Sequence, residues 1–129
     1  MIREVIQPKK LSDPRPRYSQ AILTKPGRLL FIAGQTALDD KGRIIGKGDI
    51  EKQVRQVLEN IKEILHEAGG TLENIVHTVT YTTNIKYRQS IHEIRSKYFK
   101  DSPPTSTFLV VKGLARKEFL VEIEGIAIF

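Results

Sequence analysis

Apolar residues recur at every third or fourth position through residues 49–68. The apolar positions are Ile50, Val54, Val57, Leu58, Ile61, Ile64, Leu65 and Ala68. This spacing is typical of one face of an amphipathic helix. Asp49 can cap the amino end of that helix, and Gly69-Gly70 can end it. A shorter stripe predicts a second helix before Pro103-Pro104, with apolar positions at Tyr87, Ile91, Ile94 and Tyr98.

Five stretches rich in β-branched and other apolar residues predict strands at 19–24, 29–33, 75–83, 105–112 and 120–128. Turn sequences at 25–28 and 39–42 separate the early elements, because Pro fixes φ and Gly tolerates positive φ. Residues 7–17 contain three prolines and predict an extended arm. The element order is β-β-α-β-α-β-β, and a short extra strand near 43–45 is left open. Two helices can then cover one face of a four- or five-stranded mixed sheet.

The final predicted strand has apolar residues on both of its faces. By the two-residue period of a strand, one face carries Val121, Ile123, Gly125, Ala127 and Phe129. The other face carries Leu120, Glu122, Glu124, Ile126 and Ile128. If the helices cover the first face, the second face is still half apolar, and an exposed apolar sheet face usually marks an interface. We therefore expect the protein to self-associate.

Composition narrows the class of protein without identifying a reaction. The chain has 129 residues, which fits a single domain over 1–129, and no Cys, which excludes disulfides and thiolate chemistry. We expect a cytoplasmic protein that does not cross a membrane, because no apolar run fits a leader sequence or a membrane span. The net charge is +6, but Lys and Arg are interleaved with Glu, which argues against nucleic acid as a partner.

Glu122 and Glu124 are the first candidates for chemistry, because carboxylates two positions apart on a strand share a face at a spacing of roughly 7 Å. Burial would raise the pKa of such a carboxyl group and suit it to acid–base catalysis. The alternative is that both carboxylates lie on a solvated strand face and have no catalytic role. The three histidines lack ligand spacing, which argues against a metal site. Gly34 ends a strand, where a backbone can approach a ligand or another chain closely.

An ordered set of segments is similar to the RidA (YjgF) family over nearly the whole chain. Residues 17–21 read Arg-Tyr-Ser-Gln-Ala, and residues 33–35 read Ala-Gly-Gln, which resembles the family's Ser-Gly-Gln strand end. Gln53, the helical segment 57–61 and Ala-Gly-Gly at 68–70 follow in order. The closing segment 120–127 reads Leu-Val-Glu-Ile-Glu-Gly-Ile-Ala, which resembles the family's Val-Glu-Ile-Glu ending.

The resemblance implies a chorismate-mutase-like α+β fold and a homotrimer whose sheets line a central barrel, with clefts between subunits. It also implies hydrolysis of reactive enamines and imines to a 2-keto acid and ammonia, with no metal or organic cofactor. By position, Tyr18 matches the family's cleft tyrosine, Gly34 the glycine that faces the ligand, and Glu122 the glutamate that holds the attacking water. The other cleft positions that the resemblance implies are Ala33, His92, Ser106, Thr107 and Phe108.

The sequence departs from the family at the position that binds the substrate carboxylate. Active deaminases of the family carry an Arg there, and this chain has Ser106. A hydroxyl cannot replace a guanidinium, because a charge-assisted hydrogen bond contributes about 1.5 to 3 kcal/mol. We therefore expect a cleft that does not prefer 2-imino acids with a free carboxylate, unless Lys112, Arg116 or Arg17 of a neighbouring copy supplies the cation. The alternative function is a non-catalytic trimer that binds a small molecule or regulates a partner.

Overall fold

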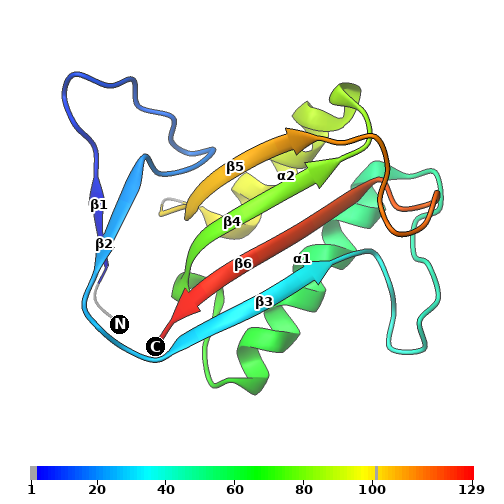
Figure 1. Ribbon diagram of the computed structural model, residues 1–129, viewed down its shortest axis with the longest axis horizontal. Helices are drawn as coiled ribbons and strands as arrows, with labels where there is room; N and C mark the ends of the chain where they lie inside the picture. The colour runs from blue at the N-terminus through cyan, green and yellow to red at the C-terminus, as the bar shows by residue number, and fades with distance from the viewer. Residues whose placement is uncertain (1–2, 101) are drawn as a thin grey trace.

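Two helices pack on one face of a four-stranded sheet in the structure, a computed structural model that describes residues 3–100 and 102–129 (Figure 1). The helices are α1 (Ile50–Glu67) and α2 (Arg88–Phe99). The strand order is β3-β6-β4-β5, with β4 and β5 parallel and the other neighbours antiparallel. These strands are β3 (Leu29–Gln35), β4 (Ile75–Thr82), β5 (Thr105–Val110) and β6 (Val121–Ile128). The predicted α+β class, with a mixed sheet and both helices on one face, is confirmed.

Helix α1 begins at its predicted cap, because the Asp49 carboxylate accepts a hydrogen bond from the Lys52 N–H. It ends before Gly69, whose φ of +90° costs glycine little. The apolar stripes of the two helices and the covered face of the sheet form one core. Its fully or nearly fully buried members include Val54, Val57, Leu58, Ile61 and Leu65 of α1, Ile91 and Ile94 of α2, and Val121, Ile123 and Ala127 of β6.

Strand β6 alternates between the two faces of the sheet as its sequence predicts. Its even-numbered residues up to Ile126, including Glu122 and Glu124, are half-buried on the uncovered face, whereas the odd-numbered residues are buried under the helices. Ile128 departs from the pattern, because it was predicted for the uncovered face and is only 5% exposed. Its Cγ1 would lie 3.2 Å from a Cβ at Gly27, so the turn before β3 covers it.

Residues 3–24 form a separate two-stranded ribbon beside the main sheet (Figure 1). Strand β1 (Arg3–Ile6) pairs antiparallel with β2 (Ala21–Thr24). Of the predicted four- or five-stranded sheet, the four-stranded form is therefore the one observed, with β2 outside it. Strand β1 was missed because four residues are too few to establish a two-residue period. The Pro-rich segment 7–17 does not run as an extended arm, since it bends through turns closed by hydrogen bonds from Leu11 N to Pro8 O and from Arg17 N to Pro14 O.

Short elements complete the connections between the main helices and strands. The 3-10 turns η1 (Leu72–Asn74) and η2 (Ile85–Tyr87) precede β4 and α2. The short strand left open near 43–45 reduces to one isolated bridge between Leu38 and Ile44. None of the helices in the described residues has both the length and the apolar character that a bilayer crossing requires.

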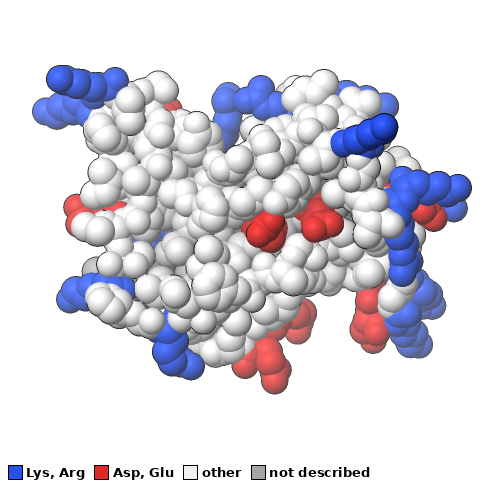
Figure 2. Space-filling model, viewed as in Figure 1, with Lys and Arg blue, Asp and Glu red and all other residues white. Residues whose placement is uncertain are grey.

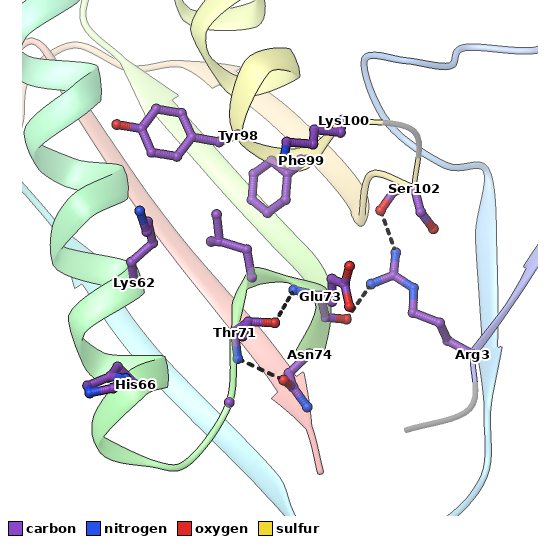
Figure 3. Close-up of a pocket in the computed structure, with 12 residues that line it drawn as sticks. Arg3, Lys62, His66, Thr71, Glu73, Asn74, Tyr98, Phe99, Lys100 and Ser102 are labelled. Carbon is purple, nitrogen blue, oxygen red and sulfur yellow. Dashed lines mark hydrogen bonds between the residues drawn. The ribbon is translucent and has the colours of Figure 1, made fainter.

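Arg3 ties the ribbon to the body of the protein (Figure 3). Its Nη1 donates to the backbone oxygens of Glu73 and Ile75 at 2.9 and 2.7 Å. Its Nη2 donates to the backbone oxygens of Ser102 and Pro103 at 2.9 and 3.2 Å. One guanidinium thus joins β1 to the segments that precede β4 and β5. Its removal would leave these carbonyl groups without their donor.

Arg3→Ala should release the ribbon while the main core stays folded. Hydrogen bonds to a charged donor contribute about 1.5 to 3 kcal/mol, so the free energy of local opening should fall by at least about 1 kcal/mol. Limited trypsin digestion should then cut faster within residues 7–17, and amides of 3–24 should exchange faster with solvent. Glu4→Ala, an exposed change on the same strand, is the control. Equal cleavage rates for Arg3→Ala and the parent would contradict this role.

Candidate functional site

The Glu122 carboxylate lies on the uncovered face of the sheet, directly against Gly34. A Cβ at position 34 would overlap the carboxyl group of Glu122. Gly34 belongs to an irregular step of β3, where the register with β6 shifts between Ile32 and Gln35. Such a bulge re-aims the local backbone, and the missing side chain leaves the space that the carboxylate occupies. Gly34 therefore leaves room for the Glu122 carboxylate beside β3.

The two carboxylates of β6 have different surroundings. Burial raises the pKa of Glu122, and the nearby charge of Glu124 raises it further. Glu124 accepts a hydrogen bond from the Tyr81 hydroxyl, and this bond raises the pKa of Tyr81. Within the described residues, no side chain donates a hydrogen bond to Glu122. Glu124 is thus held by its partner, whereas Glu122 can take a proton from a small molecule or return one.

The face around these carboxylates is largely uncharged. Figure 2 shows acidic side chains in the middle of this face, with uncharged atoms around them. By strand register, Leu29, Phe31 and Leu109 share the face, and they are 58%, 71% and 43% exposed. An exposed apolar face of this kind is typical of a protein–protein interface. The sequence-based expectation of self-association stays a prediction that this surface favours.

Four of the predicted cleft residues line one pocket of about 410 Å³ between α2 and β5: Tyr18, His92, Ser106 and Phe108. The other lining residues are Arg17, Ile85, Arg88, Arg95 and Val110. The His92 and Phe108 rings meet edge to face, with centroids 5.3 Å apart. Burial lowers the pKa of His92 to about 4, and the charges of Arg95, Arg88 and Arg17 contribute to the same shift. His92 is therefore neutral at pH 7.

The pocket and the Glu122 carboxylate lie on opposite faces of the sheet. Ser106 pairs with Thr78 of β4, which pairs with Gly125 on the helix-covered side of β6. Glu122 pairs instead with Tyr81, on the uncovered side. Residues paired across a sheet share a face, and alternate residues switch faces. One copy of the chain therefore does not bring the predicted acid to the predicted binding pocket.

The remaining predicted residues fall on the side of the acid. Thr107 pairs with Val79, which pairs with Glu124, so Thr107 is exposed on the uncovered face. Ala33 is exposed beside Gly34 in the irregular step of β3, and its carbonyl accepts a hydrogen bond from the Gln35 side chain. The predicted site thus divides into an acid half on the uncovered face, formed by Ala33, Gly34, Thr107 and Glu122, and a pocket half formed by Tyr18, His92, Ser106 and Phe108.

Arginine side chains are the pocket residues that the sequence analysis missed. The sequence pointed to Lys112, Arg116 or Arg17 of a neighbouring copy as a substitute cation; the Arg17 that lines this pocket belongs to the same copy, and Lys112 and Arg116 are not among the residues that line it. Arg88 and Arg95 were overlooked. The available signal was position 95 itself, four residues after Ile91 and four before Phe99, on the buried stripe of α2. A charged residue on a buried helical stripe needs an explanation.

A larger hollow of about 800 Å³ lies at the other end of the helices and contains none of the predicted site residues (Figure 3). Arg3 enters it, but that guanidinium already serves four backbone oxygens. We therefore place the candidate site at the two halves described above. Within residues 3–100 and 102–129, no three His, Asp or Glu side chains gather closely enough to bind a metal ion.

Glu122→Gln should raise the thermal midpoint at pH 7. A carboxyl group whose pKa is raised in the folded state destabilises that state when ionised, and this effect disappears as the pH falls below the ordinary value of 4.5. The midpoint difference between variant and parent should therefore be small and positive at pH 7 and vanish near pH 4. Glu63→Gln, on the exposed side of α1, is the matched control. A lower midpoint for Glu122→Gln at pH 7 would show that the carboxylate is not desolvated.

Comparisons with known proteins identify the family. The family model described as Endoribonuclease L-PSP matches residues 9–129. A RutC family protein of Pyrococcus abyssi is 40% identical over 127 residues, and the 3-aminoacrylate deaminase RutC of Acinetobacter baylyi is 30% identical over 127 residues; each alignment covers 98% of both chains. The crystal structure of YyfB from Yersinia pestis, a Rid family protein of unknown function, matches with a TM-score of 0.93 and 36% identity over 100% of both chains. The chain therefore belongs to the RidA (YjgF) family.

Proposed function

We propose that this chain forms a homotrimer and hydrolyses a small imine or enamine in clefts between its copies, with Glu122 activating the attacking water. The observation that carries the proposal is the state of the Glu122 carboxylate. It is partly desolvated, its pKa is raised, and it is seated against Gly34 with no donor among the described residues. A carboxylate in that state is suited to general acid–base work near neutral pH.

The separation of the acid half from the pocket half within one copy supports a site that is shared between copies. The acid half occupies an apolar sheet face, and the pocket half lies beside the edge strand β5. A second copy that covers the apolar face with its β5 edge would bury that face and bring its own pocket to Glu122. Closed cyclic symmetry lets every copy give one half and receive the other. A trimer of this kind has three equivalent clefts.

The chemistry needs one water and one proton carrier. Glu122 takes a proton from water as the water oxygen adds to the carbon of the N-protonated C=N bond, which gives a neutral carbinolamine. The protonated Glu122 then returns that proton to the nitrogen, the C–N bond breaks as the carbinolamine hydroxyl gives its own proton to Glu122, and a carbonyl compound and ammonia leave. An enamine first gains a proton at its β-carbon to become the imine. The net reaction consumes one water for each C=N bond.

The relative from Acinetobacter supports a deaminase role for this chain. That protein is a 3-aminoacrylate deaminase, and it aligns with this chain over 98% of both. 3-Aminoacrylate is an enamine with a carboxylate. We therefore infer that the substrate is a small enamine or imine. The residues of the pocket half would determine which one is preferred.

Ser106 favours one alternative, a trimer that binds a small carbonyl compound without turning it over. The hydroxyl replaces the arginine of active deaminases and provides no charge toward a substrate. Such a protein would keep the cleft and bind keto acids or related metabolites. It would show ligand-dependent thermal shifts but no acceleration of imine hydrolysis, whereas the enzyme would show both.

Subunit complementation should test both the reaction and the shared cleft. In a coupled assay with a dehydratase that generates 2-iminobutanoate, Glu122→Gln alone should lose at least about 100-fold in turnover, because general acid–base catalysis contributes that much. The double variant Tyr18→Ala/His92→Ala should lose at least about tenfold through poorer substrate positioning. Co-expressed in equal amounts, the two variants should recover about a quarter of the parent's activity, because each cleft of a cyclic trimer draws its halves from two copies.

The control is each variant co-expressed with itself, which should show no recovery. Activity that is recovered only when the two variants are mixed would support clefts built from two copies. Full parental activity in Glu122→Gln would refute the catalytic role of the acid. Inactivity of both variants and of their mixture, with an active parent, would refute the shared cleft. An inactive parent, beside an active deaminase as standard, would support the binding trimer.

A further inference from the structure

Three guanidinium groups line the pocket half, and none of the residues that line it is acidic. Arg17 comes from the loop before β2, Arg88 begins α2, and Arg95 lies two turns further along that helix. The ion pairs found among the described residues involve other side chains. The pocket is thus a concentration of positive charge without a protein counterion in the part of the chain that the structure describes.

Arg95 is the most unusual of the three. It is only 3% exposed, and it donates to the Thr78 hydroxyl at 2.9 Å and to the Arg17 backbone oxygen at 3.3 Å. Its Nε is buried without a hydrogen-bond partner. Its guanidinium also lies 5.2 Å from the centroid of the Phe99 ring. All of these contacts are to neutral groups, and a buried charge without an opposite charge is costly.

The buried positive charge affects the pKa of Arg95 and of its neighbour His92. Burial lowers the pKa of Arg95 to about 10. Burial, together with the charges of the three arginine side chains, lowers the pKa of His92 to about 4, so the imidazole adds no further positive charge at pH 7. A site of this kind gains stability when an anion enters it, because the anion pairs with several guanidinium groups that otherwise repel one another.

We propose that the pocket between α2 and β5 binds the anionic group of the ligand, a carboxylate or a similar small oxyanion, and that Arg88 and Arg95 supply the cation absent at position 106. The role of this group as a substrate anchor rests on the proposed function. The Ser106 and Tyr18 hydroxyls provide neutral donors beside it. The cation would then come from helix α2 rather than from position 106 on the strand, which reverses the expectation that a free carboxylate is disfavoured.

A purely structural role for Arg95 is the competing explanation, since its guanidinium holds the Arg17 carbonyl and Thr78. A substitution of Arg88 distinguishes the structural explanation from the anion site. It is exposed, and its side chain makes no hydrogen bond within the described residues. A structural account therefore gives Arg88 no effect on ligand binding. The anion site predicts that its removal weakens binding of acids and leaves binding of their neutral analogues unchanged.

The test uses the full chain and three probes: 2-oxobutanoate, its methyl ester and inorganic phosphate. Affinity is measured by calorimetry, and the His92 imidazole is titrated by NMR in the presence and absence of each probe. The acid should bind at least about tenfold more tightly than the ester, as a charge-assisted pair implies. It should also raise the pKa of His92 from its low value, because the anion offsets the charges of Arg17, Arg88 and Arg95.

Arg88→Ala should weaken the acid at least about fivefold, and Lys97→Ala, an exposed cation on the same helix outside the pocket, should leave it unchanged. Phosphate binding that also depends on Arg88 would support the anion site. If phosphate binds more tightly than 2-oxobutanoate, the natural ligand carries a phosphate group. Equal affinity for acid and ester, or an unchanged affinity in Arg88→Ala, would overturn the proposal.

The same measurements keep this proposal separate from the proposed reaction. Glu122→Gln should still bind the acid, because Glu122 belongs to the other half of the cleft. Acid binding without turnover would support the anion site and refute the deaminase. Turnover of imines with no preference for acids over esters would support the deaminase and refute the anion site.

Discussion

Side chains of a β-strand alternate between two faces, and this alternation separates the acid of this protein from its binding pocket. Glu122 projects from the uncovered face through its pairing with Tyr81, while Ser106 projects toward the helices through its pairing with Thr78. A shift of one residue in register would exchange these faces, but it would also expose the buried residues of β6. The hydrophobic core therefore fixes where the acid points. Any site that combines both halves has to be built from more than one copy.

The surroundings of each half give it a distinct chemical character. On the open face, the space left by Gly34 and the burial around Glu122 favour a carboxyl group that can accept and return a proton. Its neighbour Glu124 is held by Tyr81, so the two carboxylates do not compete for the same task. On the helix side, a neutral His92 lines a pocket together with three arginine side chains, to which we assign the binding of an anion. The proposed acid–base group and the proposed cationic anchor therefore lie apart within one copy and do not form an ion pair there.

The sequence predicted best what the hydrophobic pattern controls directly. The stripe of α1, its Asp49 cap and the alternating faces of β6 were all predicted, because burial and strand period leave little freedom at those positions. The ribbon was not, because β1 is four residues long and the pairing of β2 depends on distant contacts of Arg3. Sequence position alone also could not tell that Ser106 and Glu122 lie on opposite faces of the sheet, since the register of β5 with β4 is a tertiary feature. Arg95 escaped notice because a cation on an apolar stripe contradicts the pattern that reveals the helix.

The central claim is that one copy's acid completes another copy's pocket, and a crystal structure of the assembled protein with 2-oxobutanoate bound tests it most directly. The account predicts that the ligand lies between two copies, with the Glu122 carboxylate of one copy facing the His92 and Ser106 side chains of the other. A structure in which Glu122 of every copy faces solvent, or in which the ligand contacts a single copy, would contradict it.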